Sequence, residues 1–347
     1  MSYQANEKRY DKMLYRKVGN SGLKLPAISL GLWRNFGDDI PLTTQKALIL
    51  KAFDLGITHF DLANNYGGGA AEQNFGLIFK AYLQDYRDEL IISTKAGYHM
   101  WDGPYGDGGS RKYLVSSCDA SLKRLGLDYV DIFYHHRHDP ETPLEETALA
   151  LDSLVRSGKA LYIGISNYSA KDAEAISHIF KALHTPFIIN QMKYNLLERD
   201  FEKDSKALTI DEGVGNISFS PLAQGQLTNR YLIGIPTDSR IARKGALTDA
   251  ESFEKNLEIV RALKLIAETR QQTIAELAIA WQLRDSGISS VLIGASRVSQ
   301  LEENVKALEN ITFSDLELQT INDILKENVK TKRKAKKWTE WNKLHLQ

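Results

Sequence analysis

Residues 129–165 read YVDIFYHHRHDPETPLEETALALDSLVRSGKALYIGI, the clearest strand–helix–strand unit in the chain. Apolar runs lie at its two ends, residues 129–134 and 160–165. Between them, residues 145–157 space their apolar side chains as an amphipathic helix does. Neither run alternates cleanly between apolar and polar residues, which is typical of strands buried on both faces of a sheet. The unit therefore predicts two parallel strands joined by a right-handed crossover.

The same unit recurs along the chain. Apolar runs, often β-branched or aromatic, lie at residues 27–33, 57–62, 90–94, 129–134, 160–165, 187–190, 217–222 and 290–293. Helix-like segments lie near residues 43–56, 70–84, 111–125, 145–157, 170–183, 200–212, 253–285 and 299–309. Eight such units predict an α/β fold, a (β/α)8 TIM barrel, rather than a doubly wound sheet. Because no Pro- or Gly-rich linker divides the chain, we expect one domain over residues 1–347.

Local signals refine this fold. Residues 15–25 have a Gly/Asn turn between short polar strands, which predicts a hairpin that caps the bottom of the barrel. Thr43 is expected to cap the first helix, and Gly56 to end it. Long connections follow the third and seventh runs, at residues 97–112 and 223–248. Because the sites of such barrels lie at the carboxyl ends of the strands, we expect these loops to border the site.

The composition excludes several classes of protein. The 44 basic and 44 acidic side chains give a formal net charge of zero, so no overall field favours nucleic acid or an anionic membrane. One cysteine, Cys118, permits no internal disulfide and no cysteine metal cluster, which indicates a reducing compartment. No apolar run approaches the roughly 20 residues that cross a bilayer, and the first residues do not resemble a signal peptide. We expect a cytoplasmic protein without a metal and without nucleic-acid or membrane partners; homo-oligomerisation stays open.

The charge is concentrated at the end of the chain. Residues 326–347 carry eight Lys or Arg against two Glu, a net charge of +6, and leave −6 on the remainder. Trp338 and Trp341 lie among these charges. The tail is either an interaction segment or a solvated helix whose tryptophans pack on the barrel, and we favour the second interpretation because a basic run is usually a solvated face.

Polar side chains cluster where three consecutive runs end. Asp61 ends the second run, Lys95 follows the third, and His135 and His136 follow the fourth. Tyr66 comes five residues after Asp61. Because the carboxyl ends of the strands meet at one face of a barrel, these side chains are expected to lie together.

Such a group has a chemical use. Lys95 and Asp61 are expected to pair, since either charge alone is costly to bury. A tyrosine beside the lysine has its phenolate stabilised, so the pKa of Tyr66 is expected to fall from about 10 toward neutrality. The tyrosine then donates a proton, and the histidine is a second donor to a developing alkoxide. Each residue alone is more often structural, but four compatible residues on consecutive strands favour a catalytic site.

These motifs together resemble those of the aldo-keto reductase superfamily, over about residues 14–325. The matching segments are FDLANNYG (60–67), STK (93–95), the strand-four histidine, GISNY (164–168), NQMKYN (190–195), FSPLAQG (219–225) and GAS (294–296). The likeness is strongest to the branch that holds the bacterial L-glyceraldehyde 3-phosphate reductases and the potassium-channel beta subunits. Residues 29–33, 98–101 and 109–114 point toward the reductases.

The resemblance implies roles for the four residues. Tyr66 would donate the proton, Lys95 would lower its pKa, and Asp61 would be the partner of Lys95. His136 would orient the carbonyl and stabilise its oxygen. Since side chains alternate along a strand, His135 and His136 cannot both face the barrel mouth within a strand, and the family pattern selects His136.

The resemblance also implies NADPH lying extended across the barrel mouth. The residues that it assigns to the cofactor are Trp33, Asp61, Ser166, Asn167, Gln191, Phe219, Ser220, Pro221, Leu222, Ala223, Gln224, Arg230, Arg240, Gly294, Ser296, Gln300, Glu303 and Asn304. Many family members grip the 2′-phosphate with a Lys-Ser pair and a downstream Arg, whereas residues 294–297 here read GASR. Arg230 and Arg240 match basic positions of the closer branch. Because a phosphate needs positive partners, NADPH is favoured over NADH.

The expected activity is reduction of a small aldehyde or ketone to the alcohol, for example L-glyceraldehyde 3-phosphate or methylglyoxal. Arg111, Lys112 and Arg137 near the mouth either attract an anionic substrate or form surface ion pairs. The alternative from another class is an NADP-binding regulatory protein like the beta subunits, which have Asn where this chain has His136. A Schiff-base aldolase using Lys95 is less favoured, because Asp61 is expected to keep the lysine protonated.

Overall fold

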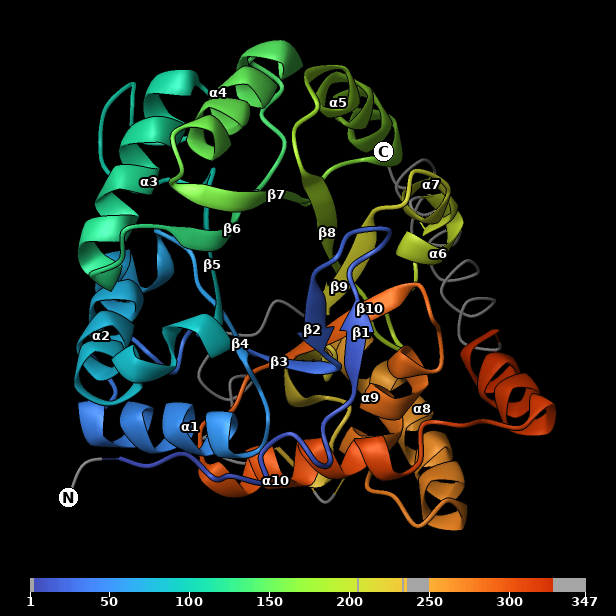
Figure 1. Cartoon of the computed structure of the whole chain (residues 1–347). Helices are drawn as coiled ribbons and strands as arrows, with labels where there is room; N and C mark the ends of the chain where they lie inside the picture. The colour runs from blue at the N-terminus through green and yellow to red at the C-terminus, as the bar shows by residue number, and fades with distance from the viewer. Residues whose placement is uncertain (1–2, 205, 233, 236–249, 327–347) are drawn as a thin grey trace, which may run out of the picture.

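The computed structural model of the chain is a closed barrel of parallel strands surrounded by helices (Figure 1). Neighbouring strands follow the order β10-β3-β4-β5-β6-β7-β8-β9 around the barrel. Their bounds are β3 Ile28–Gly31, β4 His59–Asp61, β5 Ile91–Ala96, β6 Val130–His135, β7 Ala160–Ser166, β8 Phe187–Lys193, β9 Gly215–Phe219 and β10 Ile288–Ile293. All eight predicted strands are present, so the predicted barrel is confirmed.

The structure describes residues 3–204, 206–232, 234–235 and 250–326. Arg240 and the tail from residue 327 onward, with Trp338 and Trp341, lie outside the described residues. Among the helices of the described part, none is long and apolar enough to cross a membrane. The prediction of one domain over residues 1–347 stays a prediction.

Helices follow the strands and cover the outside of the barrel, with α1 beside α10 (Figure 1). The α-helices are α1 Leu42–Asp54, α2 Ala70–Ile78, α3 Arg111–Leu125, α4 Leu144–Arg156, α5 Ala170–Leu183, α6 Phe201–Asp204, α7 Lys206–Asp211, α8 Ala250–Thr269, α9 Ile274–Leu283 and α10 Val298–Lys306. Short helical turns are η1 Tyr66–Gly69, η2 Phe79–Leu83, η3 Gln84–Glu89, η4 Ala223–Gly225, η5 Asn229–Tyr231 and η6 Ala307–Glu309. The helices bury apolar faces against the strands, as the sequence periodicity predicts.

Two helix predictions are wrong. Residues 253–285 form two helices rather than one, because Gln271 takes a φ of +56° and Thr273 caps a new helix, α9, in a capping box with Glu276. Thr43 does not cap α1: the N-cap residue is Pro41, and Thr43 lies inside the first turn. Proline is tolerated there because the residue before the helix contributes no backbone N–H to the helical hydrogen bonds.

The other element boundaries differ in smaller ways. The helix predicted near residues 70–84 ends as an α-helix at Ile78 and continues as the π-helical turn η2. The strand predicted at residues 217–222 is β9, Gly215–Phe219, which ends earlier because Ser220 turns the backbone with a φ of +55°. Apolar composition alone did not reveal this change of backbone direction.

The N-terminal hairpin is confirmed, and it closes the bottom of the barrel. Strands β1, Tyr15–Lys17, and β2, Lys24–Pro26, pair antiparallel. The backbone N–H of Asn20 donates to Gly213 O at 2.8 Å, just before β9. Leu25 is fully buried in an apolar cluster with Ile132 and Ile217 from the barrel strands. The hairpin therefore completes the core at the end opposite the strand carboxyl ends.

Replacing Leu25 by Ala is expected to lower the free energy of unfolding by about 2–5 kcal/mol, because it opens a cavity at this closed end. Leu14, 41% exposed, is a matched control whose replacement by Ala should change stability by less than about 0.5 kcal/mol. Urea unfolding of both variants measures the difference. Equal losses would show that the hairpin does not contribute to the core.

Candidate active site

The four predicted catalytic residues come from three neighbouring elements at the carboxyl end of the barrel. Asp61 ends β4, Lys95 lies near the end of β5, and His136 directly follows β6. Tyr66 opens the turn η1 after β4. The next three residues are glycines with φ of +58°, +64° and +100°, a conformation that other residues rarely adopt. This turn keeps Tyr66 close to the end of β4.

Asp61 and Lys95 form a buried ion pair. Lys95 Nζ lies 2.5 Å from Asp61 Oδ2, and both side chains are fully buried. The ammonium also donates to Leu62 O at 2.6 Å. The other carboxylate oxygen, Asp61 Oδ1, accepts from Ser93 Oγ at 2.6 Å and from Gln191 Nε2 at 3.2 Å. Such extra hydrogen bonds are what makes a buried ion pair tolerable.

Tyr66 and His136 meet this pair at the barrel mouth. Lys95 Nζ lies 3.5 Å from Tyr66 Oη. The ring centroids of Tyr66 and His136 are 5.9 Å apart, and those of Tyr66 and Trp33 are 6.3 Å apart. Tyr98, from the long loop after β5, packs perpendicular to the His136 ring at 4.7 Å. The structure thus brings the four residues together, and Trp33 with them.

One prediction about the tyrosine is wrong. Burial raises the pKa of Tyr66 well above its usual value, and the negative charge of Asp61 raises it further. The reason is geometric: Lys95 directs its short hydrogen bonds to Asp61 and Leu62, and its ammonium contacts the phenol only at 3.5 Å. Burial also lowers the pKa of Lys95, and Asp61 opposes this shift. Tyr66 is therefore a protonated phenol, the form that donates a proton.

The two adjacent histidines face different surroundings. His135 Nδ1 is hydrogen-bonded to Tyr168 Oη at 2.5 Å, away from Tyr66, and burial lowers the pKa of His135 to about 4. Burial, and next the charge of Lys95, lower the pKa of His136 well below its usual value. Both imidazoles are therefore neutral near pH 7, and His136 is the one beside Tyr66.

The comparison with known proteins agrees with this geometry. The sequence model of the Aldo/keto reductase family matches residues 27–326. The chain belongs to the aldo/keto reductase family. It is 56% identical over 328 residues to L-glyceraldehyde 3-phosphate reductase of Escherichia coli (strain K12), covering 92% of this chain and 95% of the relative. This aldo/keto reductase is an oxidoreductase that acts on carbonyl groups and reduces aldehydes.

The chain is also similar to proteins described as channel subunits. It is 40% identical over 325 residues to the "Putative voltage-gated potassium channel subunit beta" of Schizosaccharomyces pombe, covering 90% of this chain and 93% of the relative. It is 38% identical over 306 residues to the "Probable voltage-gated potassium channel subunit beta" of Arabidopsis thaliana, covering 86% and 92%. The aldo/keto reductase family thus includes relatives described as enzymes and relatives described as channel subunits.

Enzymes of this family typically use NAD(P)H. Several residues that the resemblance assigned to the cofactor border the tetrad, that is, Asp61, Tyr66, Lys95 and His136. Ser166 ends β7, and Asn167 follows it with a φ of +55°. Asn167 Nδ2 donates to His136 O at 2.9 Å and to Ser166 Oγ at 3.0 Å. Gln191, on β8, already contacts Asp61. These amide and hydroxyl groups lie beside the four catalytic candidates.

The loop after β9 holds a strained backbone. Phe219 ends β9, and Ser220, Ala223 and Gln224 take φ of +55°, +46° and +58°, the left-handed region that non-glycine residues rarely enter. Pro221 is buried and Leu222 half-buried within the same loop. Strain of this kind persists where a site needs a particular backbone shape. A backbone that follows a bound pyrophosphate is one such need.

A second group of assigned residues extends from the end of β10 into α10. Gly294 has open space where a side chain would be. Gln300 Oε1 accepts from Ser296 N at 2.8 Å and from its Oγ at 3.1 Å. Asn304 is buried, yet its Nδ2 has no hydrogen-bond partner, although buried donors are normally satisfied. Glu303 is half-buried beside it. A buried amide without a protein partner fits a polar ligand such as the adenosine end of a dinucleotide.

The candidate phosphate-binding arginines are only partly within the described structure. Arg230 lies exposed in η5, Arg297 is the exposed N-cap residue of α10, and Arg240 falls outside the described residues. Near the mouth, Arg137 Nε donates to Gly97 O at 2.9 Å, and its Nη2 lies 3.2 Å from Asp107 Oδ2. Of the two explanations for Arg137, the structure therefore supports a surface ion pair.

Sequence reasoning missed several residues of the site. Ser93 and His59 precede Lys95 and Asp61 by two positions, and alternation along a strand places them on the same interior face. Tyr134, on β6, faces Lys95 in the strand register, with its ring centroid 5.7 Å from Lys95 Nζ. The signal was available for Ser93 and His59, since residues i and i−2 share a face.

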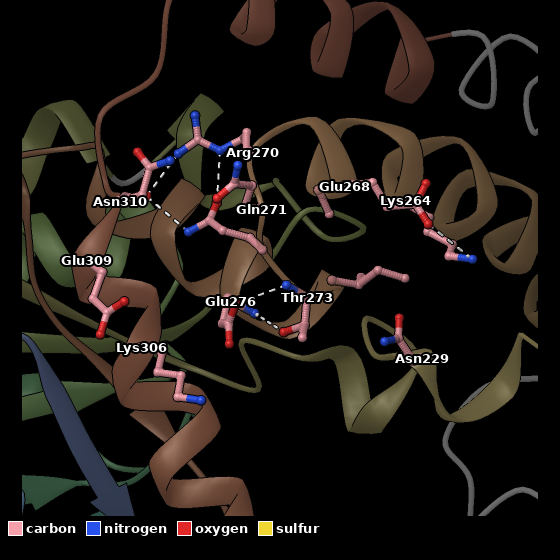
Figure 2. A pocket seen from close by; sticks show the side chains of 13 residues that line it. Asn229, Lys264, Glu268, Arg270, Gln271, Thr273, Glu276, Lys306, Glu309 and Asn310 are labelled. Atoms are coloured by element: carbon pink, nitrogen blue, oxygen red, sulfur yellow. Dashed lines mark hydrogen bonds and ion pairs between the residues drawn. The ribbon is translucent and has the colours of Figure 1, made fainter.

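A separate hollow of about 650 Å³ lies between α8, α9 and the end of α10 (Figure 2). None of the predicted site residues lines it. Several of its charged groups are paired: Lys264 Nζ lies 3.3 Å from Glu268, and Arg270 lies 2.7 Å from Glu317 and donates to Asn310 O. The N-terminal end of α9 there is closed by its own capping box. This hollow is a feature of helix packing, apart from the candidate active site.

Among the described residues, no group of three His, Cys, Asp or Glu side chains is placed to hold a metal ion.

Proposed function

We propose that this aldo/keto reductase reduces a small aldehyde or ketone with NADPH and that Tyr66 is the proton donor. The observation that carries the proposal is the contiguous group at the barrel mouth. A buried Lys95–Asp61 pair lies 2.5 Å apart, with Tyr66 Oη 3.5 Å from the ammonium and His136 against the Tyr66 ring. A cytoplasmic setting, which the single cysteine favours, is part of the proposal.

Each of these residues has a task in the reduction. Held beside Ser166, Asn167 and Gln191, a reduced nicotinamide would supply a hydride to the carbonyl carbon. Tyr66 gives its hydroxyl proton to the carbonyl oxygen as negative charge develops there. The phenolate that remains lies next to the Lys95 ammonium, which stabilises it. His136, a neutral imidazole, donates a hydrogen bond to the same oxygen and orients it.

Asp61 supports the proton donor indirectly, through its ion pair with Lys95. Burial alone lowers the pKa of Lys95, which would deprive Tyr66 of its cationic neighbour. The Asp61 carboxylate and, more weakly, Glu72 counter this shift. The ion pair thereby keeps a positive charge at the point where the phenolate forms. The same pairing speaks against a Schiff-base role for Lys95, which needs an unprotonated amine.

NADPH is preferred over NADH in this proposal because the exposed Arg297 adjoins Ser296, one of the residues assigned to the adenosine end. Replacing Arg297 by Ala is expected to weaken NADPH binding by about 1.5–3 kcal/mol and to leave NADH binding nearly unchanged, since only NADPH carries the 2′-phosphate. Fluorescence titration with both cofactors measures the two dissociation constants.

Lys306, exposed at the other end of α10, is the matched control. Lys306→Ala removes one positive charge from the same helix and should change neither affinity by more than about twofold, as expected for a screened surface charge. Equal dissociation constants for NADPH and NADH in the unmutated protein would refute the cofactor preference.

The similarity to an L-glyceraldehyde 3-phosphate reductase supports a small aldehyde as substrate. We therefore propose L-glyceraldehyde 3-phosphate and methylglyoxal as the first compounds to test. A panel of aldehydes and ketones, followed by the oxidation of NADPH and NADH, tests the reaction and the substrate together. Absence of turnover with the whole panel would overturn the proposed activity.

The second candidate function is an NADP-binding regulatory subunit, and the similarity to the two proteins described as channel beta subunits supports it. His136 favours the enzyme, because an NADP-binding subunit needs no donor to a substrate oxygen. Tight NADPH binding without turnover of any carbonyl compound would favour the regulatory alternative.

A further inference from the structure

A continuous row of hydrogen bonds runs inside the barrel and ends at Asp61. Ser290 Oγ lies 2.6 Å from Ser29 Oγ, which lies 2.8 Å from His59 Nδ1. His59 Nε2 lies 2.9 Å from Ser93 Oγ, which lies 2.6 Å from Asp61 Oδ1. All five side chains are buried with an exposure of zero. We call these five residues the buried row.

Parallel strand register assembles the buried row from four strands. Ser290 lies on β10, Ser29 on β3, His59 and Asp61 on β4, and Ser93 on β5. These strands are neighbours in the barrel, with Asp61 opposite Ser93 in the register. His59 and Asp61 are two positions apart, so both side chains point inward. Elsewhere in the interior, Ile132, Ile189, Ile217 and Leu292 form an apolar cluster.

The direction of every proton in the buried row follows from the state of Asp61. Lys95 Nζ at Oδ2 and the Gln191 amide at Oδ1 are donors, so Asp61 is an ionised carboxylate that only accepts. Ser93 Oγ must then donate to Asp61, and it accepts from His59 Nε2–H. His59 Nδ1 carries no proton and accepts from Ser29 Oγ. Ser29 in turn accepts from Ser290.

The imidazole of His59 is neutral, as this assignment requires. Burial, and more weakly the charge of Lys95, lower the pKa of His59 to about 4 against the opposing influence of Asp61. A neutral imidazole has one donor and one acceptor, and both are used here. His59 therefore links Ser29 to Ser93, and through Ser93 to Asp61, by hydrogen bonds, without adding a charge to the interior.

We propose that His59 is a positioning residue for the reduction. Through Ser93 it holds Asp61 as an ionised, correctly oriented carboxylate, which in turn keeps Lys95 protonated next to Tyr66. This inference rests on the proposed function of Tyr66 and Lys95. It goes beyond that function because it extends the machinery to the first layer of side chains beneath the tetrad.

In the described structure, few polar or charged side chains surround Asp61 and Lys95. Asp61 meets Lys95, Ser93 and Gln191 by hydrogen bonds, and the charges of Asp61 and Glu72 act on Lys95. The titratable side chains around Lys95 are Tyr66, Tyr134 and His136. None of these three donates to Asp61 in the described structure. The row through Ser93 is therefore one of only three side-chain donors that Asp61 has there.

The first test does not depend on activity. Nitrogen-15 NMR of histidine-labelled protein is expected to show His59 neutral, with the proton on Nε2, throughout the range from about pH 6 to 8, well above its pKa of about 4. Assignment uses His59→Phe, which removes that signal alone. A proton on Nδ1, or a charged ring in this range, would reverse the row and overturn the inference whatever the enzyme does.

The second test compares activity across the row. His59→Phe and Ser93→Ala are each expected to lower kcat about tenfold with KM values changed less than about twofold, the size of one weakened charge-assisted hydrogen bond. Ser29→Ala, one step further from Asp61 than His59, should lower kcat by less, again with little change in KM.

Ser218→Ala is the matched control for these serine variants. Ser218 is also a fully buried serine on a barrel strand, but its hydroxyl donates to Gln282 at 2.7 Å and does not contact the buried row. It should leave kcat nearly unchanged. Equal losses of kcat in Ser218→Ala and Ser93→Ala, or an unchanged kcat in folded Ser93→Ala, would overturn the positioning role. If the unmutated protein reduces no carbonyl compound, the proposed function fails instead, and the NMR result still decides the direction of the row.

Discussion

Replacing Tyr66 by Phe is expected to lower the rate of carbonyl reduction by about 100- to 10,000-fold, the usual contribution of a positioned general acid. The substitution removes only the hydroxyl whose oxygen lies 3.5 Å from Lys95 Nζ. Ring packing against Trp33 and His136 is retained, so the fold should be preserved. NADPH should still bind, because the residues assigned to the cofactor lie mainly on later strands. Steady-state kinetics measure the rate of reduction, and fluorescence titration separately measures NADPH binding.

Lys95→Met provides the coupled test of the same mechanism. If Lys95 acts by stabilising the Tyr66 phenolate, it has little left to stabilise once the hydroxyl is gone. The double variant should therefore lose much less than the sum of the two single losses, expressed as free energies. Near-normal turnover in Tyr66→Phe would refute the proton-donor assignment. Full additivity would show that Lys95 acts on another group.

The pH dependence follows from the raised pKa of Tyr66. Because burial stabilises the protonated phenol, Tyr66 keeps its proton as the pH rises through neutrality. Reduction is therefore not expected to lose its proton donor between about pH 6 and 8. A loss of kcat centred near pH 7 that disappears in Tyr66→Phe would contradict this expectation.

His136→Ala is expected to lower turnover by about 100-fold or more, the loss seen when one donor to a developing oxyanion is removed. His136 lies against the rings of Tyr66 and Tyr98 at the barrel mouth. His135→Ala is the adjacent control: its ring bonds to Tyr168 and lies away from the tetrad, so stability should fall more than turnover.

Steady-state kinetics and thermal unfolding of both variants show which histidine serves turnover and which serves stability. Because the imidazole of His136 is neutral, its contribution should not change between about pH 6 and 8. A larger turnover loss in His135→Ala than in His136→Ala would mean that the other histidine faces the substrate.

Much of the fold was predictable because it depends on local patterns. The eight apolar runs and the helical segments between them predicted the barrel, and a Gly/Asn turn predicted the hairpin. The errors arose where backbone conformation, rather than hydrophobicity, sets a boundary. Gln271 divides the long helix near residue 270, and Ser220 ends β9 early, both by positive φ values that composition does not reveal.

The candidate site, like the fold, was predictable from the sequence only in part. The order of runs placed Asp61, Lys95 and His136 at strand ends, and a barrel brings consecutive strand ends together. The pKa of Tyr66 was not predictable, since it depends on how deeply the phenol is buried and on the 3.5 Å separation from Lys95 Nζ.

The amino-acid sequence by itself thus determined the barrel, the closing hairpin and the residue types at the strand ends. Only the tertiary structure decided which polar groups meet inside. Ser29 and Ser290 are 261 residues apart, and His59 and Ser93 are 34 apart, yet each pair is hydrogen-bonded. Barrel closure and parallel register bring them together. A local pattern records which face of a strand a side chain occupies, but its partner across the interior depends on how the strands are aligned.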